Sequence, residues 1–279
     1  MKFGQFEIDS FVEQRFRLDG GTMFGILPKS IWQQLVPVNK DNLISMVTNI
    51  FVLRAHGRKI LFDIGLGDTL SKREKRVYGT EGDSSLESGL TGLDLTPDDI
   101  DYVILTHLHT DHAGGAVRLE DGRYVPRFRN AKYVISREEW KVATNPNERT
   151  AAVYIPERLH PLKEAGQVEF IERDTELFPG IRAVYTGGHT EGHFALEMES
   201  DGEKVFYYAD IFPMTPYMRV PYVSAADIFP LDTMEVKRKV LPEIVNRDVV
   251  LAFDHDTKVP LGTVREVENK LVVEPVASV

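Results

Sequence analysis

Histidine and aspartate gather in one short stretch of the chain, Thr106-His107-Leu108-His109-Thr110-Asp111-His112, which holds three of the eight histidines. Alternate residues of an extended segment point to the same side, so His107 and His109 can bind one cation together. Asp111 and His112 follow at a turn, where they can reach a second cation. Imidazoles at this density usually bind metal, and a solvated, histidine-rich loop is the plainer alternative. The stretch therefore predicts a metal site.

One cluster cannot complete such a site, because a tetrahedral metal takes about four ligands and a catalytic metal keeps one position for water. His189 lies among glycines at 187, 188 and 192, which suit a tight ligand loop. Asp210 and His255 each follow a strongly apolar segment, 205–209 and 249–253. A hydrogen-bonded structural histidine or a turn-capping aspartate is the alternative at each position. We predict that all three are metal ligands.

Other polar residues near these segments are predicted to have supporting or surface positions. His193 is expected to hold a ligand in place rather than to bind metal. Asp63 ends its own apolar segment, and the sequence favours neither the same supporting role nor a position without one. His56 and His160 lie beside turn-forming residues and are expected at the surface.

The elements that must position these residues are short apolar segments that run into polar turns. The predicted strands cover residues 49–53, 59–62, 102–105, 132–135, 182–185, 205–208 and 249–253, and the first two form a hairpin. Four of the strands end within two residues of a histidine or an aspartate. Loops held by a rigid sheet are where active sites tend to be built.

Helix signals lie between the strands. The segment 96–99 has a capping residue, a proline at the first helical position and acids in the first turn. Ser136 to Glu139 reads as a capping box that predicts a helix through Trp140. A third helix opens at Asp232, with apolar residues at helical spacing. Strands mixed with helices predict an α/β fold, and the lack of a linker or repeat favours one domain over residues 1–279.

Composition narrows the class of protein. The chain has 279 residues and a net charge of −10, and an acidic chain is a poor partner for nucleic acid. It has no cysteine, which excludes disulfides, thiolate ligands and cysteine nucleophiles. Its start lacks the apolar region of a signal peptide, and no apolar stretch is long enough for a membrane span. We expect a cytoplasmic protein with a small-molecule substrate and no nucleic-acid or membrane partner.

The order of the candidate ligands resembles the metallo-β-lactamase superfamily. The resemblance rests on His107-x-His109-x-Asp111-His112, followed by His189, Asp210 and His255, and spans most of the chain. It implies an αββα sandwich with the site at one edge of two sheets. It also implies one metal on His107, His109 and His189, a second on Asp111, His112 and His255, and Asp210 as a bridge. Two divalent ions per chain follow, with zinc favoured and iron, manganese or cobalt also compatible.

Several branches of that superfamily do not match. The commonest zinc β-lactamases use a cysteine ligand, and flavodiiron proteins have a glutamate where this chain has His109. Glyoxalase II carries a helical C-terminal domain, whereas only 24 residues follow His255. The chain is most similar to N-acyl homoserine lactonases and to related organophosphate hydrolases, in residues 19–29, 105–109 and 187–193. By analogy, residues 1–45 are expected to form an N-terminal extension that lines the pocket or a dimer interface, and a homodimer is expected.

The resemblance implies lactone hydrolysis by a hydroxide shared between the two metals. Asp210 would hold both ions, and Asp111 would carry a proton to the leaving alcohol. The same site would also serve a phosphotriester or an aryl ester, which is the alternative activity, and a metal sensor without activity is disfavoured because no ligand of the set is missing.

One position departs from the pattern. Some lactonases place a catalytic tyrosine three residues after the bridging aspartate, where this chain has Pro213, so Tyr217 or Tyr222 would have to substitute. The apolar segment 211–218, with Met23 and Phe24, is predicted either to form a hydrophobic pocket wall or to pack in the core or a dimer contact.

Overall fold

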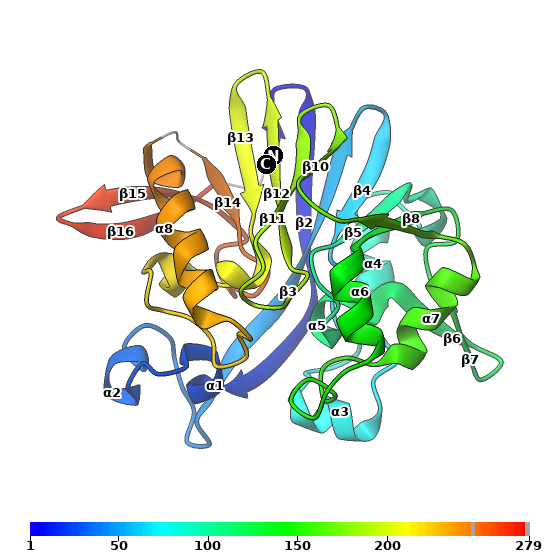
Figure 1. Cartoon of the computed structure of the whole chain (residues 1–279), viewed down its shortest axis with the longest axis horizontal. Helices are drawn as coiled ribbons and strands as arrows, with labels where there is room; N and C mark the ends of the chain where they lie inside the picture. The colour runs from blue at the N-terminus through cyan, green and yellow to red at the C-terminus, as the bar shows by residue number, and fades with distance from the viewer. Residues whose placement is uncertain (247–248, 277–279) are drawn as a thin grey trace.

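The computed structural model describes residues 1–246 and 249–276. Two seven-stranded sheets occupy its centre (Figure 1). The first has the order β1-β2-β3-β4-β5-β8-β9 and the second runs in sequence order from β10 to β16. A separate two-stranded ribbon is formed by β6 (Val117–Glu120) and β7 (Arg123–Pro126).

The first sheet combines a long antiparallel pair with a parallel half. Its strands are β1 (Lys2–Phe3), β2 (Phe6–Asp19), β3 (Leu43–Ala55), β4 (Arg58–Phe62), β5 (Tyr102–Leu105), β8 (Lys132–Ser136) and β9 (Val168–Ile171). The pairing of β2 with β3 runs from Glu7 opposite Arg54 to Asp19 opposite Leu43. Residues 1–45 therefore supply a full strand of the sheet. The strands β4, β5, β8 and β9 are parallel, so their carboxyl ends meet at one edge.

The second sheet is antiparallel except for one parallel pair, β13 with β14. Its strands are β10 (Thr175–Phe178), β11 (Ile181–Tyr185), β12 (Phe194–Ser200), β13 (Glu203–Tyr207), β14 (Val250–Ala252), β15 (Leu261–Val267) and β16 (Lys270–Pro275). Parallel neighbours again end at the same edge, which brings the residues after β13 and β14 together.

Helices cover the outer faces of both sheets (Figure 1). The covering helices are α4 (Leu86–Thr91), α6 (Arg137–Thr144) and α7 (Pro156–Glu164) on the first sheet and α8 (Pro230–Asn246) on the second. The short helices α1 (Gly20–Phe24), α2 (Lys29–Trp32) and α3 (Lys72–Val77) lie at the lower end of the view in Figure 1, and α5 (Thr110–Ala113) follows β5. Among the described residues, no helix is long and apolar enough to cross a bilayer.

Three buried clusters show the order of the layers. Phe51 and Phe62 of the first sheet pack with Leu196 and Tyr207 of the second, so one core lies between the sheets. A second core joins the first sheet to α4, α6 and α7, and a third joins the second sheet to α8. The order is helix, sheet, sheet, helix, and the predicted αββα sandwich is confirmed.

Most predicted elements are present, with shifts at their ends. All seven strands form, and β3 and β4 make the expected hairpin. The helix expected at 96–99 is wrong, because the structure has only a single 3-10 turn, Pro97–Asp99, before the chain enters β5. Thr96 and Asp99 cap each other across that one turn, so the capping signal is real but no helix follows. The helix expected from Asp232 is α8, which begins at Pro230.

Candidate metal centre

The candidate ligands follow strands of both sheets and lie close together at one edge of the two sheets. His107 follows β5, His189 follows β11, Asp210 follows β13 and His255 follows β14. His109 precedes α5 and His112 lies inside it, so the chain turns back toward His107. Gly114 makes this turn possible, since a Cβ there would lie 2.3 Å from the carbonyl oxygen of Leu66.

The first group of possible ligand atoms comes from His107, His109, His189 and Asp210, all within 4.8 Å of one another. His189 Nε2 lies 2.9 Å from Asp210 Oδ2 and 3.1 Å from His109 Nδ1. His107 Nε2 lies 3.9 Å from the same Asp210 oxygen. Three imidazoles and one carboxylate oxygen thus surround a single point.

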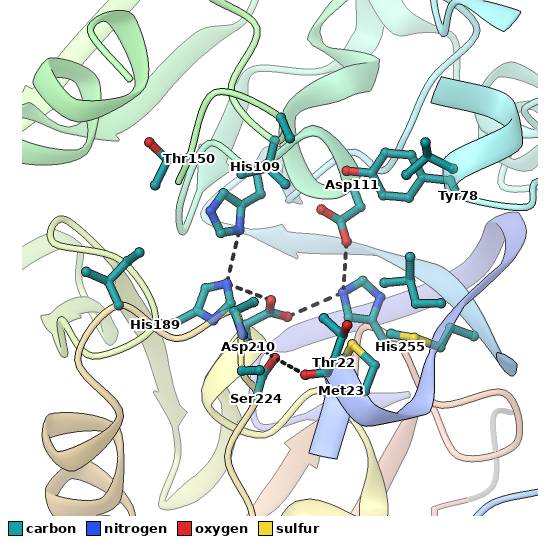
Figure 2. Close-up of a pocket in the computed structure, with 18 of the residues that line it drawn as sticks. Thr22, Met23, Tyr78, His109, Asp111, Thr150, His189, Asp210, Ser224 and His255 are labelled. Atoms are coloured by element: carbon teal, nitrogen blue, oxygen red, sulfur yellow. Dashed lines mark hydrogen bonds and ion pairs between the residues drawn. The ribbon is translucent and has the colours of Figure 1, made fainter. Parts of the chain in front are cut away.

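The second group comes from His112, His255, Asp210 and Asp254. His112 Nε2 and His255 Nε2 are 3.2 Å apart, and they lie 3.4 and 3.3 Å from Asp210 Oδ1. The two oxygens of Asp210 therefore face different groups, Oδ2 the first and Oδ1 the second. Figure 2 shows Asp210 between His189 and His255.

Asp111 lies beside the second group rather than inside it. Its Oδ2 is 3.7 Å from His255 Nε2, and its side chain points into a cavity (Figure 2). Six of the seven predicted ligands belong to the two groups, and Asp254, which was not predicted, takes a place in the second.

Acceptors on the outer ring nitrogens orient the histidines. Nδ1 of His112 donates to Asp63 at 2.9 Å, and Nδ1 of His189 donates to Asp227 at 2.8 Å. Nδ1 of His255 donates to the carbonyl of Val47 at 2.8 Å. In each case Nε2 is left to face the cluster, which is the arrangement common at metal sites. Asp63 thus has its predicted supporting position, whereas Asp227 lies in an irregular loop without a sequence signal.

Glu139 connects two ligand loops and was not predicted to do so. Its carboxylate, fully buried, accepts from the backbone N–H of Leu108 at 3.0 Å and of Gly192 at 3.2 Å. It also accepts from the hydroxyls of Thr190 at 2.6 Å and Tyr154 at 2.7 Å. The predicted capping box is only half formed for this reason, since Ser136 caps α6 while Glu139 turns to the site.

The remaining histidines agree with expectation in position. His193 is buried 5.2 Å from the His107 ring and forms a 2.6 Å hydrogen bond with the Thr186 hydroxyl through Nδ1, outside both groups. His56 and His160 are exposed.

Electrostatics divide the histidines into two sets. Burial, together with repulsion from neighbouring imidazoles, holds the pKa values of His107 and His109 well below the ordinary value, so both are neutral. Burial opposes charge on His189 and His255 too, but nearby carboxylates outweigh it and raise their pKa values to about 10 and about 9. Burial likewise acts against charge on Asp210, yet His189 and His112 hold its pKa well below the ordinary value.

Several buried polar atoms of the cluster have no hydrogen-bond partner among residues 1–246 and 249–276. They are Nε2 of His107, Oδ1 of Asp210 and both carboxylate oxygens of Asp254. Buried polar groups are normally paired, and an unpaired carboxylate is especially costly. Imidazole nitrogens and carboxylate oxygens in this arrangement fit divalent metal ions, zinc among them.

A cavity of about 350 Å³ opens onto this cluster, with His109, Asp111, His189, Asp210 and His255 in its wall (Figure 2). Its apolar lining comes from Leu18, Met23, Met46, Val77, Val153 and Ile228. Thr22, Arg149, Thr150 and Ser224 add polar groups. Residues 1–45 therefore help to line the pocket, as expected.

Of the two alternatives for the segment 211–218, pocket wall or packing in the core or a dimer contact, the structure supports core packing, whereas Met23 does line the cavity. None of these eight positions lines the cavity. Ile211, Phe212 and Met218 pack in the core under α8, and Met214 and Tyr217 pack near Phe24. The apolar character of the segment thus reflects core packing.

The predicted substitutes for the missing tyrosine are in the wrong place. The Tyr217 hydroxyl donates to the carbonyl of Met23, the Tyr222 hydroxyl accepts from Arg219 at 3.0 Å, and neither residue lines the cavity. The tyrosine that does line it is Tyr78, at the end of α3. Its hydroxyl points toward the Asp111 carboxylate (Figure 2). The capping box of Ser71 and Glu74 could have located α3, but not its approach to the site.

Proteins similar to this chain include enzymes named as lactonases or metal-dependent hydrolases. An N-acyl homoserine lactonase of Bacillus cereus is 28% identical over 170 residues, which cover 57% of this chain and 61% of the relative. The match thus spans about three-fifths of the relative's length. A probable metal-dependent hydrolase from Staphylococcus aureus is 29% identical, with a TM-score of 0.91 and full coverage of both chains.

A further solved structure, AidC, is described as a dizinc quorum-quenching lactonase in complex with a product. It is 19% identical and superposes with a TM-score of 0.82 over 100% of this chain and 97% of its own, which shows a shared fold. The model of the metallo-beta-lactamase superfamily matches residues 45–255, a range that includes every residue of both groups, and the chain belongs to this superfamily.

Proposed function

We propose that this protein is a dinuclear metal-dependent hydrolase that opens the lactone ring of N-acyl homoserine lactones. The observation that carries the proposal is the position of Asp210, whose two oxygens face separate histidine groups at the wall of an apolar cavity. The names of similar proteins support the choice of substrate.

The proposed ligands divide between two ions. His107, His109 and His189 hold one, His112 and His255 hold the other, and Asp210 bridges both. Asp111 joins the second ion from the cavity side, where its carboxylate lies 3.7 Å from His255 Nε2. Zinc suits this set, and iron, manganese or cobalt would also bind.

When bound, two divalent ions bring the pKa of a water molecule down to about 7 and polarise an ester carbonyl. The chain's own residues supply the rest. Asp111 faces the cavity, so it can accept the proton of the attacking water and return it to the ring oxygen, which leaves as an alcohol. The new carbon–oxygen bond comes from water, and the bond that breaks is the one between the acyl carbon and the ring oxygen.

The cavity fits a substrate with a small polar head and an apolar tail. Its volume of about 350 Å³ is near the lower end of ligand pockets, which span roughly 300–1,000 Å³. Met23, Met46 and Ile228 offer apolar surface to an acyl chain. The backbone N–H of Ile228 donates a 3.0 Å hydrogen bond to the carbonyl of His189, which fixes the loop that carries Ile228.

Side-by-side turnover tests this proposal. Zinc-loaded protein should hydrolyse N-hexanoyl homoserine lactone with a kcat/KM well above that for the phosphotriester paraoxon and for an aryl ester, and removal of metal by a chelator should abolish activity until zinc is restored. A phosphotriester or aryl ester preference would replace the lactone as substrate. Activity that survives chelation would overturn the metal mechanism.

We also propose that residues 1–279 form a single domain and that the protein is a homodimer. Ile26 is 93% exposed, and Ile31 and Leu35 near it are 44% and 41% exposed, which gives the segment around α2 an apolar surface that a second copy could cover. Light scattering should give twice the chain mass, and replacement of Ile26 and Ile31 by serine should give the monomer. A monomeric wild type would contradict the dimer.

A further inference from the structure

Asp254 is a buried carboxylate in the middle of the cluster. It follows β14 and directly precedes His255, and only 3% of its side chain is exposed. Its Oδ2 lies 3.4 Å from His255 Nε2 and 3.7 Å from His112 Nε2. The same two nitrogens lie 3.3 and 3.4 Å from Asp210 Oδ1.

Within the part of the chain that the structure describes, neither oxygen of Asp254 has a hydrogen-bond partner. The adjacent carboxylate, Asp63, is different, since it accepts from the N–H and hydroxyl of Thr106, from His112 and from the Tyr207 hydroxyl at 2.7–2.9 Å. Asp63 thus orients other groups, whereas Asp254 has no such hydrogen bonds among the described residues and presents Oδ2 to the imidazoles of His112 and His255. A buried carboxylate without partners is costly unless a cation or a proton compensates its charge.

Among the described residues, the ion pairs of Asp254 are with His255 and His112 alone. It does not line the large cavity. It borders a separate void of about 10 Å³, together with Asn49, Asp63 and Tyr207. A void of this size is at the limit for one water molecule, which needs about 10–15 Å³. Substrate in the large cavity therefore does not reach Asp254.

We propose that Asp254 is an additional ligand of the ion held by His112 and His255, bound from the protein interior opposite the cavity. This inference rests on the proposed dinuclear site. With Asp254 as a ligand, the two metal positions differ in their donor atoms. The first has three imidazoles and the Asp210 carboxylate. The second has two imidazoles and the carboxylates of Asp210, Asp111 and Asp254. Oxygen-rich sites accept manganese more readily than nitrogen-rich sites, so the second position is the manganese-tolerant one.

Asp254→Asn tests the assignment, with Asp256→Asn as the matched control. Asp256 lies in the same loop, but its carboxylate accepts from the backbone N–H groups of Thr215, Lys258 and Val259 and is not part of either group. Zinc is titrated calorimetrically into metal-free protein, and bound metal is counted by elemental analysis after dialysis.

Wild type and Asp256→Asn should bind two zinc ions per chain. Asp254→Asn should keep one tight ion and lose affinity for the second by at least roughly 10- to 100-fold, the range for loss of a group that supports a metal ligand. The rise in its melting temperature on addition of zinc should be smaller than that of the wild type.

The outcomes separate the two proposals. Two zinc ions bound by Asp254→Asn with wild-type affinity would overturn the role of Asp254 and leave the dinuclear hydrolase standing. Equal loss in both variants would assign the effect to the loop and also overturn it. A wild type that binds fewer than two ions would refute the proposed dinuclear site itself.

Discussion

The carboxylate of Asp63 accepts a hydrogen bond from Nδ1 of His112 at 2.9 Å, across 49 positions of sequence. The same carboxylate accepts a 2.7 Å hydrogen bond from the hydroxyl of Tyr207, in the opposite sheet. It thereby joins both sheets directly behind the site and directs His112 Nε2 toward Asp210. The acceptor on the second ring nitrogen of a histidine ligand fixes the orientation of the ring and so the position of the nitrogen that binds metal.

Replacement of Asp63 by asparagine should therefore weaken metal binding without removal of any ligand. We expect a zinc affinity lower by about 10- to 100-fold and a loss of about 1–3 kcal/mol of unfolding free energy, because buried donors lose their acceptor. Calorimetric zinc titration and urea unfolding measure the two effects. Asp201→Asn, in an exposed turn, is the control. Unchanged zinc affinity in Asp63→Asn would refute the orienting role.

Glu139 should act through the ligand loops in a similar way. Glu139→Gln keeps the shape of the side chain but replaces one accepting oxygen by a donor that faces N–H and O–H groups. We expect a stability loss of about 1–3 kcal/mol. Glu138→Gln is the matched control, since the side chain of Glu138 is 46% exposed and its only ion pair among the described residues is with Lys141. Equal stability of the two variants in urea unfolding would count against the cross-link.

Tyr78 is the tyrosine that can hydrogen-bond a bound substrate, since it lines the cavity beside Asp111. Tyr78→Phe should lower kcat for the lactone by roughly 100-fold, the lower end of the loss seen when one donor to a developing oxyanion is removed. Zinc content and melting temperature should stay unchanged. Tyr222→Phe, away from the cavity, should keep full kcat. If both variants have wild-type kcat, Tyr78 has no part in the reaction.

Metal uptake should release protons. In the metal-free chain His189 and His255 have pKa values raised to about 10 and about 9, so both are protonated at neutral pH. Ligand nitrogens must be deprotonated, so zinc binding displaces these protons and its affinity should rise with pH up to about 9–10. By the same shifts, both histidines stabilise the metal-free fold fully below their ordinary pKa of 6.5, and this contribution is lost as pH rises through about 9–10.

Calorimetric zinc titration at pH 7 in two buffers of different ionisation enthalpy measures the release. The apparent binding enthalpy should differ between the buffers by an amount that corresponds to more than one proton per chain. An enthalpy that is independent of buffer would contradict protonated histidines in the metal-free site.

The sequence predicted the parts of the site that local patterns encode. Apolar segments that stop at polar residues located the strands, and the spacing of His107, His109 and His112 located the cluster. Asp227, Glu139 and Tyr78 escaped prediction because each meets the site through tertiary contacts over long separations. Asp254 escaped because its neighbour His255 already accounted for the polar end of β14. The role of the apolar segment 211–218 stayed open in the sequence because hydrophobicity alone does not distinguish a pocket wall from a core.

The central claim is that Asp210 holds two metal ions between its two oxygens. Anomalous diffraction at the zinc edge, from crystals grown with zinc, tests it most directly. The claim predicts two peaks about 3.5–4 Å apart, one beside Oδ2 with His107, His109 and His189, and one beside Oδ1 with His112 and His255. A single peak, or two peaks that share no Asp210 carboxylate, would contradict it.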